Sequence, residues 1–182
     1  MTEKNNNPYR PAHIANYILW KVWKANIEIT QMKLIKLVYI AYGWNLVIND
    51  DQTLFEEDIL AWEHGPVIPS IYDEFKVFGS RPITKGNYAG DFNTETGELL
   101  SVPIVSENDS DILKVLNAAW DNYKHTSLTM LHRITNEPKS PWCIAYDNGK
   151  GKNTKLDNKL IKASSLEVIN GLVRKYLNQL RT

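Results

Sequence analysis

Apolar residues in the first fifty positions recur every three or four residues, the spacing of one face of a helix. The first such stretch predicts a helix over about 11–25, which Pro11 is suited to open. The second follows Thr30, a good N-cap residue, and runs towards Val47. Its apolar side chains cover most of the helix circumference, so we expect it to be buried at the centre of the fold. Gly43 within it predicts a closely packed neighbour, because glycine otherwise costs about 1 kcal/mol there.

Shorter elements are predicted in the middle of the chain. Residues 59–63 alternate as a short strand, which Gly65 and Pro66 end. A helix with a buried apolar face then begins at Pro69. The following stretch is rich in Gly, Asn and Thr, and its predicted strands, which form a small antiparallel sheet, are Ile83 and Leu99–Val105.

Three more helical patterns occupy the last part of the chain. One follows Asn108 or Asp109, one follows Ser127, and the last follows Ser164 or Ser165; all are residue types that cap helices. Before the last helix, residues 147–159 contain two glycines, three asparagines and four lysines, which predicts a mobile surface loop.

Together these patterns predict an α+β, mainly α fold, with about six helices around a buried central helix and a small antiparallel sheet. The chain has no internal repeat and no stretch long enough to link two domains. We therefore expect a single domain over 1–182, of which 1–10 are flexible.

The composition bears on the cellular compartment and on the kinds of site that the chain can form. The chain has 182 residues, of which 43% are hydrophobic, and one cysteine, Cys143. An intramolecular disulfide and a cysteine-rich zinc site are therefore excluded, which fits a reducing cytoplasm. The apolar stretch from Ile14 to Trp23 is broken by Lys21 and is too short to span a bilayer. We expect a cytoplasmic protein without a membrane partner.

Charge is balanced overall, with 21 basic and 21 acidic side chains, but it is segregated along the chain. Residues 49–111 carry 14 acidic and 3 basic side chains, whereas residues 150–182 carry 8 basic and 2 acidic ones. A nucleic-acid-binding protein is more often basic overall. The tryptophans Trp20, Trp44, Trp62 and Trp120 lie in apolar stripes, which favours core packing of most of them over base stacking. No direct contact with nucleic acid is expected.

Residue patterns of enzyme sites are weak in this chain. The sequence has no P-loop, G-x-G-x-x-G, G-x-S-x-G or H-E-x-x-H motif, and no two histidines lie three or four residues apart. Asp58, Glu74 and Lys76 imitate the acidic pair and lysine of a metal-dependent nuclease, but the pattern around Glu74 is helical where that site needs a strand. Cys143 beside an aromatic residue is more often buried than nucleophilic. We expect no enzyme activity, no metal and no cofactor.

Two segments carry a resemblance to a known family. The first has a K-L-x-K-L-x-Y helix, a Leu-Phe-x-Glu segment and an Ala-Trp-x-x-Gly-Pro-Val turn before a helix with Tyr; the second joins Leu, Thr, an acidic residue and Pro-Trp. The matching residues are Lys33, Leu34, Lys36, Leu37, Tyr39, Leu54, Phe55, Glu57, Ala61, Trp62, Gly65, Pro66, Val67, Pro69, Tyr72, Leu131, Thr135, Glu137, Pro141 and Trp142. The chain thus resembles the Panacea domain, or SocA-like antitoxin family, also called phage-associated GepA-like. Asn136 stands where that family usually has histidine, so no titrating imidazole is available there.

The resemblance implies an antitoxin, often carried by phages or prophages, that neutralises a toxin encoded beside it, including toxins that block translation. Its partner would be that cognate protein toxin, while self-association stays open. The alternative is a phage-borne metal-dependent nuclease, or other enzyme, with a scattered site. We expect most matched residues to be structural, with Trp62 as a core anchor in a strand-to-helix turn. The candidate partner-binding residues form an acidic group around that turn: Glu56, Glu57, Asp58, Glu63, His64, Asp73 and Glu74.

Overall fold

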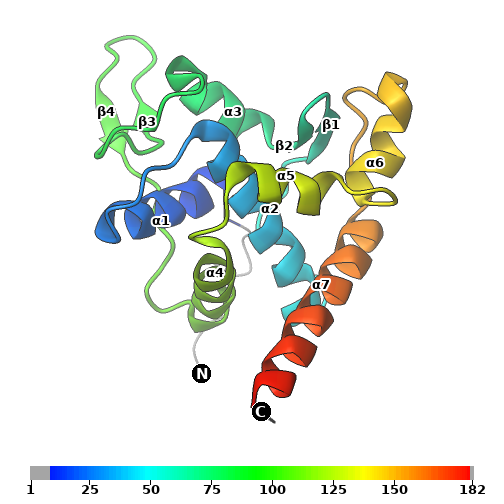
Figure 1. The fold of residues 1–182 in the computed structure, drawn as a ribbon. Coiled ribbons are helices and arrows are strands. Elements are labelled where there is room, and N and C mark those ends of the chain that lie inside the picture. Colours follow the sequence, from blue (N-terminus) through cyan, green and yellow to red (C-terminus); the bar gives the residue numbers. More distant parts are fainter. Residues whose placement is uncertain (1–8, 181–182) are drawn as a thin grey trace.

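The computed structural model of the chain describes residues 9–180. Over this part the fold is a mainly α, α+β arrangement, as predicted, with seven α-helices rather than about six, and two small sheets rather than one (Figure 1). The helices are α1 (Pro11–Lys24), α2 (Gln31–Ile48), α3 (Pro69–Phe75), α4 (Ser110–Tyr123), α5 (Leu128–Asn136), α6 (Pro141–Tyr146) and α7 (Asn158–Gln179). The strands are β1 (Leu60–Trp62), β2 (Gly65–Val67), β3 (Asp91–Phe92) and β4 (Leu99–Ser101).

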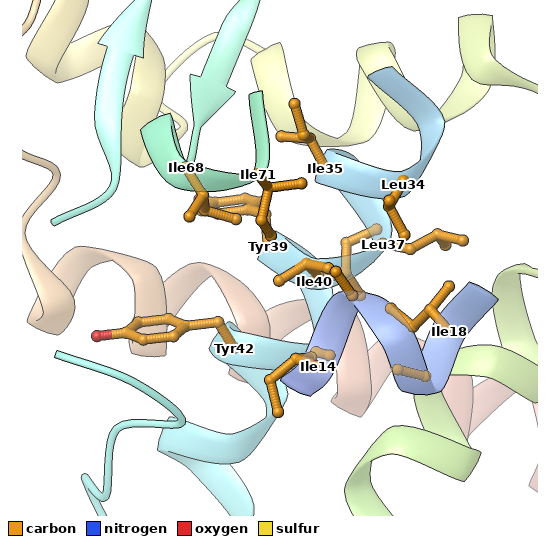
Figure 2. Packing of buried hydrophobic residues seen from close by; sticks show 14 of the residues in the cluster. Ile14, Ile18, Leu34, Ile35, Leu37, Tyr39, Ile40, Tyr42, Ile68 and Ile71 are labelled. Atoms are coloured by element: carbon orange, nitrogen blue, oxygen red, sulfur yellow. The ribbon is translucent and has the colours of Figure 1, made fainter. Parts of the chain in front are cut away.

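Helix α2 is the buried centre of the fold, as its apolar circumference predicts. Fourteen of its eighteen residues are buried, and α1, α3, α4, α5, α7 and β2 all contact it. The Thr30 hydroxyl caps its start by accepting a hydrogen bond from Lys33 N. Figure 2 shows the core at this helix, where Ile14 and Ile18 of α1 and Ile71 of α3 pack beside its side chains. The hydrophobic core therefore surrounds one helix.

Helix α7 begins at least seven residues earlier than predicted. Its N-cap is Asp157, whose side chain accepts from Lys159 N, rather than Ser164 or Ser165. Both serines lie within the helix and are half-buried. A Cβ at Gly43 would overlap the Ser165 hydroxyl, so the predicted close neighbour of Gly43 is α7.

The segment predicted as a loop over 147–159 is shorter and lies against β1. Residues Asp147–Gly149 form a 3-10 turn, and α7 has already begun at Asn158. Between them, Asn153 N donates to Ala61 O, Ala61 N to Thr154 O and Leu156 N to Ile59 O, each at 2.8 Å. The segment thus extends the edge of β1, and its mobility stays a prediction.

The sheets differ from the predicted one in their strands. Gly65 and Pro66 do more than end the first strand, because they form β2, which pairs antiparallel with β1 across a turn of Glu63 and His64. Strand β4 pairs with β3, which was not predicted. Ile83 lies in neither sheet; its N–H donates to Ile29 O and its side chain is buried.

Two further features differ from the prediction. A helix that was not predicted, α6, begins at Pro141, with Ser140 as its N-cap. Trp20 is 44% exposed, with Lys24 Nζ 4.9 Å from its ring centroid, instead of packed in the core. Of the segment predicted to be flexible, residues 1–8 lie outside the described part. The Tyr9 hydroxyl donates to Asp109 Oδ2 and Arg10 pairs with Asp91, and the flexibility of the segment stays a prediction.

Candidate functional site

Residues from the two family segments meet around one buried lysine. Lys36 lies on α2 with no exposed surface, and its Nζ donates to His64 O at 3.2 Å and to Asn136 Oδ1 at 3.0 Å. These bonds join α2 to the β1–β2 turn and to the end of α5. We call this arrangement of Lys36, His64, Gly65 and Asn136 the hairpin joint.

The hairpin joint holds a lysine among neutral acceptors. Both oxygens that accept from Lys36 are uncharged, and burial lowers the pKa of Lys36 to about 7. Burial, together with the nearby Lys36 and His64, also lowers the pKa of His132 on α5. The side-chain oxygen of Asn136 accepts a second bond from the Thr135 hydroxyl at 2.7 Å, which fixes the orientation of the amide. The joint therefore favours an uncharged Lys36.

Gly65 lets the hairpin lie directly on this lysine. Its φ of +117° is a conformation that side chains with a Cβ rarely adopt. A Cβ at this position would overlap Lys36 Nζ and lie 2.6 Å from Asn136 Oδ1. Both the backbone conformation and the close approach therefore require glycine, which gives the Gly-Pro pair a structural role.

Aromatic residues cover the outer side of the hairpin. Trp62 is half-buried on β1 rather than a core anchor, and its ring meets Tyr72 of α3 edge-on at a centroid distance of 4.9 Å. The indole N–H of Trp142 on α6 donates to Trp62 O at 2.7 Å. Pro141, buried at the first turn of α6, helps set the position of Trp142. The matched aromatic residues thus come together although they are up to 80 positions apart.

Three further matched residues lie on α2. Leu37 and Tyr39 are buried in the core. Lys33 is half-buried, and its Nζ donates to Lys124 O, the C-cap residue of α4, at 3.2 Å. All three contribute to packing on α2.

The predicted acidic residues do not share one site but lie at several places on the surface. Glu56, Glu57 and Glu74 line one surface cavity of about 510 Å³ between α1, α3 and the segment before β3. We call it the acidic cavity. Glu57 Oε1 also accepts from Ser70 N at 2.8 Å, in the first turn of α3. Arg10 and Asp91 form a two-bonded ion pair at its wall, and Arg10 lowers the pKa of the Asp91 carboxyl well below its usual range.

The remaining acidic residues lie apart from this cavity wall. Asp58 pairs with Lys155 at 2.6 Å, and Asp73 pairs with Lys76 at 2.9 Å. Glu63 and His64 are exposed at the β1–β2 turn. The His64 backbone belongs to the hairpin joint, so this residue connects the turn with Lys36.

The geometry offers no nuclease arrangement at the residues that imitate one. Glu74 lies on α3, as its helical pattern predicts, while Asp58 and Lys76 are paired with other residues. Among residues 9–180, no three His, Cys, Asp or Glu side chains gather closely enough to hold a metal ion. Cys143 is half-exposed on α6 rather than buried. Within the same range, no helix is both long and apolar enough to cross a bilayer.

The pairing of Lys36 with Asn136 and the ion pair of Arg10 with Asp91 were not predicted. A signal for the first is present in the sequence, because a lysine in a helix that is apolar all round needs a buried polar partner. Nothing in the local sequence around Arg10 indicates Asp91, since 81 positions separate them.

Comparisons with known proteins agree on one family. The family model described as "Antitoxin SocA-like, Panacea domain" matches residues 34–143, which include every residue of the hairpin joint. The chain is also similar to the protein named Antitoxin SocA of Caulobacter vibrioides (strain NA1000 / CB15N), with 27% identity over 140 residues. That match covers 77% of this chain and 71% of the relative. No solved structure shows a significant match.

Proposed function

Because this chain belongs to the SocA-like antitoxin family with the Panacea domain, we propose that it neutralises a protein toxin encoded by an adjacent gene, through direct binding. The observation that carries this proposal is the family match across 34–143. In this proposal the chain is a non-enzymatic, cytoplasmic inhibitor, carried by a phage or prophage. Its toxin is one that blocks translation.

The charge distribution supports a basic partner surface. A toxin that acts on RNA or nucleotides presents positive charge to phosphate, and an acidic antitoxin surface can occupy it. Glu56, Glu63 and Glu74 are exposed, and within the described residues no side-chain hydrogen bond or ion pair involves them. Glu57 and Asp58, in contrast, have structural partners in Ser70 N and Lys155. The first three are therefore the carboxylates available to a partner.

The proposed function predicts harmless expression of this chain alone and restored growth when it is co-expressed with the toxic product of its neighbouring gene. The two proteins should co-purify as a complex. Growth arrest by the chain alone, or rescue by a variant that no longer binds the partner, would contradict the proposal. A divalent-metal-dependent nuclease activity of the purified chain would support the alternative.

Reversal of the available carboxylates should slow toxin association. In Glu56→Lys/Glu63→Lys/Glu74→Lys we expect an association rate lowered about tenfold or more at low salt, with a weaker salt dependence, because rim charges mainly steer encounter. Stopped-flow or surface-based kinetics at low and high salt measure both quantities. The melting temperature should stay unchanged, since these side chains are exposed.

The matched control is Glu95→Lys/Glu98→Lys/Glu107→Lys. It changes the net charge by the same amount on exposed residues at and after the β3–β4 hairpin. Its association rate should exceed that of the first variant at low salt. Equal association rates for the two variants would show that net charge governs association. The position of the carboxylates near α3 and the β1–β2 hairpin would then not matter.

A further inference from the structure

The second half of α7 carries an apolar stripe that the rest of the chain leaves uncovered. The first half packs on α2, with Ile161 buried. Beyond it the large apolar residues are 43% to 66% exposed: Leu166, Val173, Tyr176, Leu177 and Leu180. In Figure 1, α7 runs away from α6 towards the C-terminal end of the ribbon at the bottom of the molecule. Exposed apolar groups of this extent mark interaction surfaces.

The spacing of the stripe is that of a helix–helix seam. Leu166, Ile169, Val173, Tyr176 and Leu180 are separated by three, four, three and four residues, which is the a/d repeat of paired helices. Ile169 is half-buried and packs against the core, so the stripe is continuous with the hydrophobic core of the chain. A second helix laid along it would extend that core.

The residues beside the seam favour a copy of the same chain as the occupant. In paired helices, charges at the flanking e and g positions select a partner of different sequence. Here those positions are occupied by Asn170, Leu172, Leu177 and Gln179, none of which is charged. Two copies of α7 therefore meet without like-charge repulsion. The charged residues Glu167, Arg174 and Lys175 occupy the outer b and c positions.

The area of the stripe suits a weak two-fold dimer. If a large apolar side chain contributes roughly 150–200 Å², the exposed fractions of Leu166, Val173, Tyr176, Leu177 and Leu180 give about 500 Å² per chain. Two copies bury about 1,000 Å², which reaches the lower range of specific interfaces. Residues 1–8 and 181–182, outside the described part, include Met1 as their one large apolar side chain, so they do not match the stripe.

We propose that a second copy of this chain covers the apolar stripe, α7 against α7, in a two-fold dimer. A closed two-fold pairing uses the same patch on both chains, so it satisfies both stripes at once. Val173 lies in the middle of the stripe, so its two copies lie near the two-fold axis. The proposal does not depend on the antitoxin function.

Light scattering and sedimentation equilibrium of the full chain test the dimer. We expect a mass that rises with concentration from one chain of 20.9 kDa towards two. Val173→Glu and Val173→Lys should each stay monomeric and, because Val173 is exposed, should melt at the temperature of the dilute, monomeric wild type. An equimolar mixture of the two variants should recover dimer, because opposite charges then meet at the axis.

Lys175→Glu, at an outer position of the same helix, is the matched control and should dimerise like the wild type. A wild-type chain that remains monomeric at high micromolar concentration overturns the proposal. So does a dimer that survives in both Val173 variants, or a mixture of them that stays monomeric.

Discussion

Gly65→Ala is expected to lower the free energy of unfolding by about 3 kcal/mol or more. The new Cβ is strained at a φ of +117°, which costs about 1–3 kcal/mol. It also overlaps Lys36 Nζ and crowds Asn136 Oδ1, so the ends of these two side chains or the hairpin must shift. Both bonds of Lys36 are then weakened in a buried site. Denaturant unfolding of the two proteins measures the difference.

Gly86→Ala separates backbone strain from this overlap. Gly86 also has a positive φ, +93°, but a Cβ there meets no atom within 4 Å. We therefore expect Gly86→Ala to lower the free energy of unfolding by the strain alone, clearly less than Gly65→Ala. Equal losses in the two variants would mean that the contact with Lys36 and Asn136 adds nothing.

The parts of the fold that depend on local periodicity were predicted from the sequence. Apolar spacing indicated α1, α2, α3, α4 and α5 close to their observed bounds, and the all-round apolar pattern of α2 indicated its central position. Gly43 correctly indicated a close neighbour. These features rest on residues within a few turns of one another, which is why a single sequence contains the information.

Most errors lie where a contact between residues distant in sequence decides the structure, and one concerns a very short helix. The start of α7 was misplaced because Ser164 and Ser165 look like caps, whereas inside the helix they pack towards α2. Strand β2 was interpreted as a stop because its Gly-Pro pair is typical of turns, whereas antiparallel pairing with β1 makes it a strand. Helix α6 was missed although Ser140 and Pro141 are a standard start, because it has only six residues.

The arrangement of the candidate partner-binding residues was not predicted. Seven residues clustered along the sequence were expected to share one surface, and the structure places three of them in the acidic cavity. Asp58 is paired with Lys155 from the segment before α7, a contact across 97 positions that no local pattern reveals. Trp62 was expected in the core because of its apolar neighbours, but alternation along β1 places Ala61 inward and Trp62 outward.

Lys36 should make the protein more stable as pH rises from 7 to about 9. Burial lowers the pKa of Lys36 to about 7 in the folded chain, against 10.5 in an ordinary lysine. Between these values the unfolded chain binds a proton that the folded chain does not, so the free energy of unfolding increases with pH. The slope is about 1.4 kcal/mol per pH unit, or about 2–3 kcal/mol over the range.

Other groups titrate mainly outside this range. The lowered pKa of His132 adds stability as pH rises, but below its ordinary pKa of 6.5. Burial raises the pKa of Tyr39, so that tyrosine costs stability only above about pH 10. Burial also lowers the pKa of Lys33. This lysine therefore adds a small increase of the unfolding free energy with pH, in the same direction as the effect of Lys36.

Urea unfolding at several pH values, compared with Lys36→Met, isolates the lysine. Methionine keeps an unbranched chain of similar length in the buried site but carries no charge, so most of the pH dependence between 7 and 9 should disappear. Lys175→Met removes an exposed lysine of α7 and should keep the wild-type slope. A Lys36→Met protein with the full wild-type slope would mean that Lys36 remains charged in the folded chain. In that case the buried ammonium group of Lys36 would be stabilised only by two uncharged acceptors, His64 O and Asn136 Oδ1.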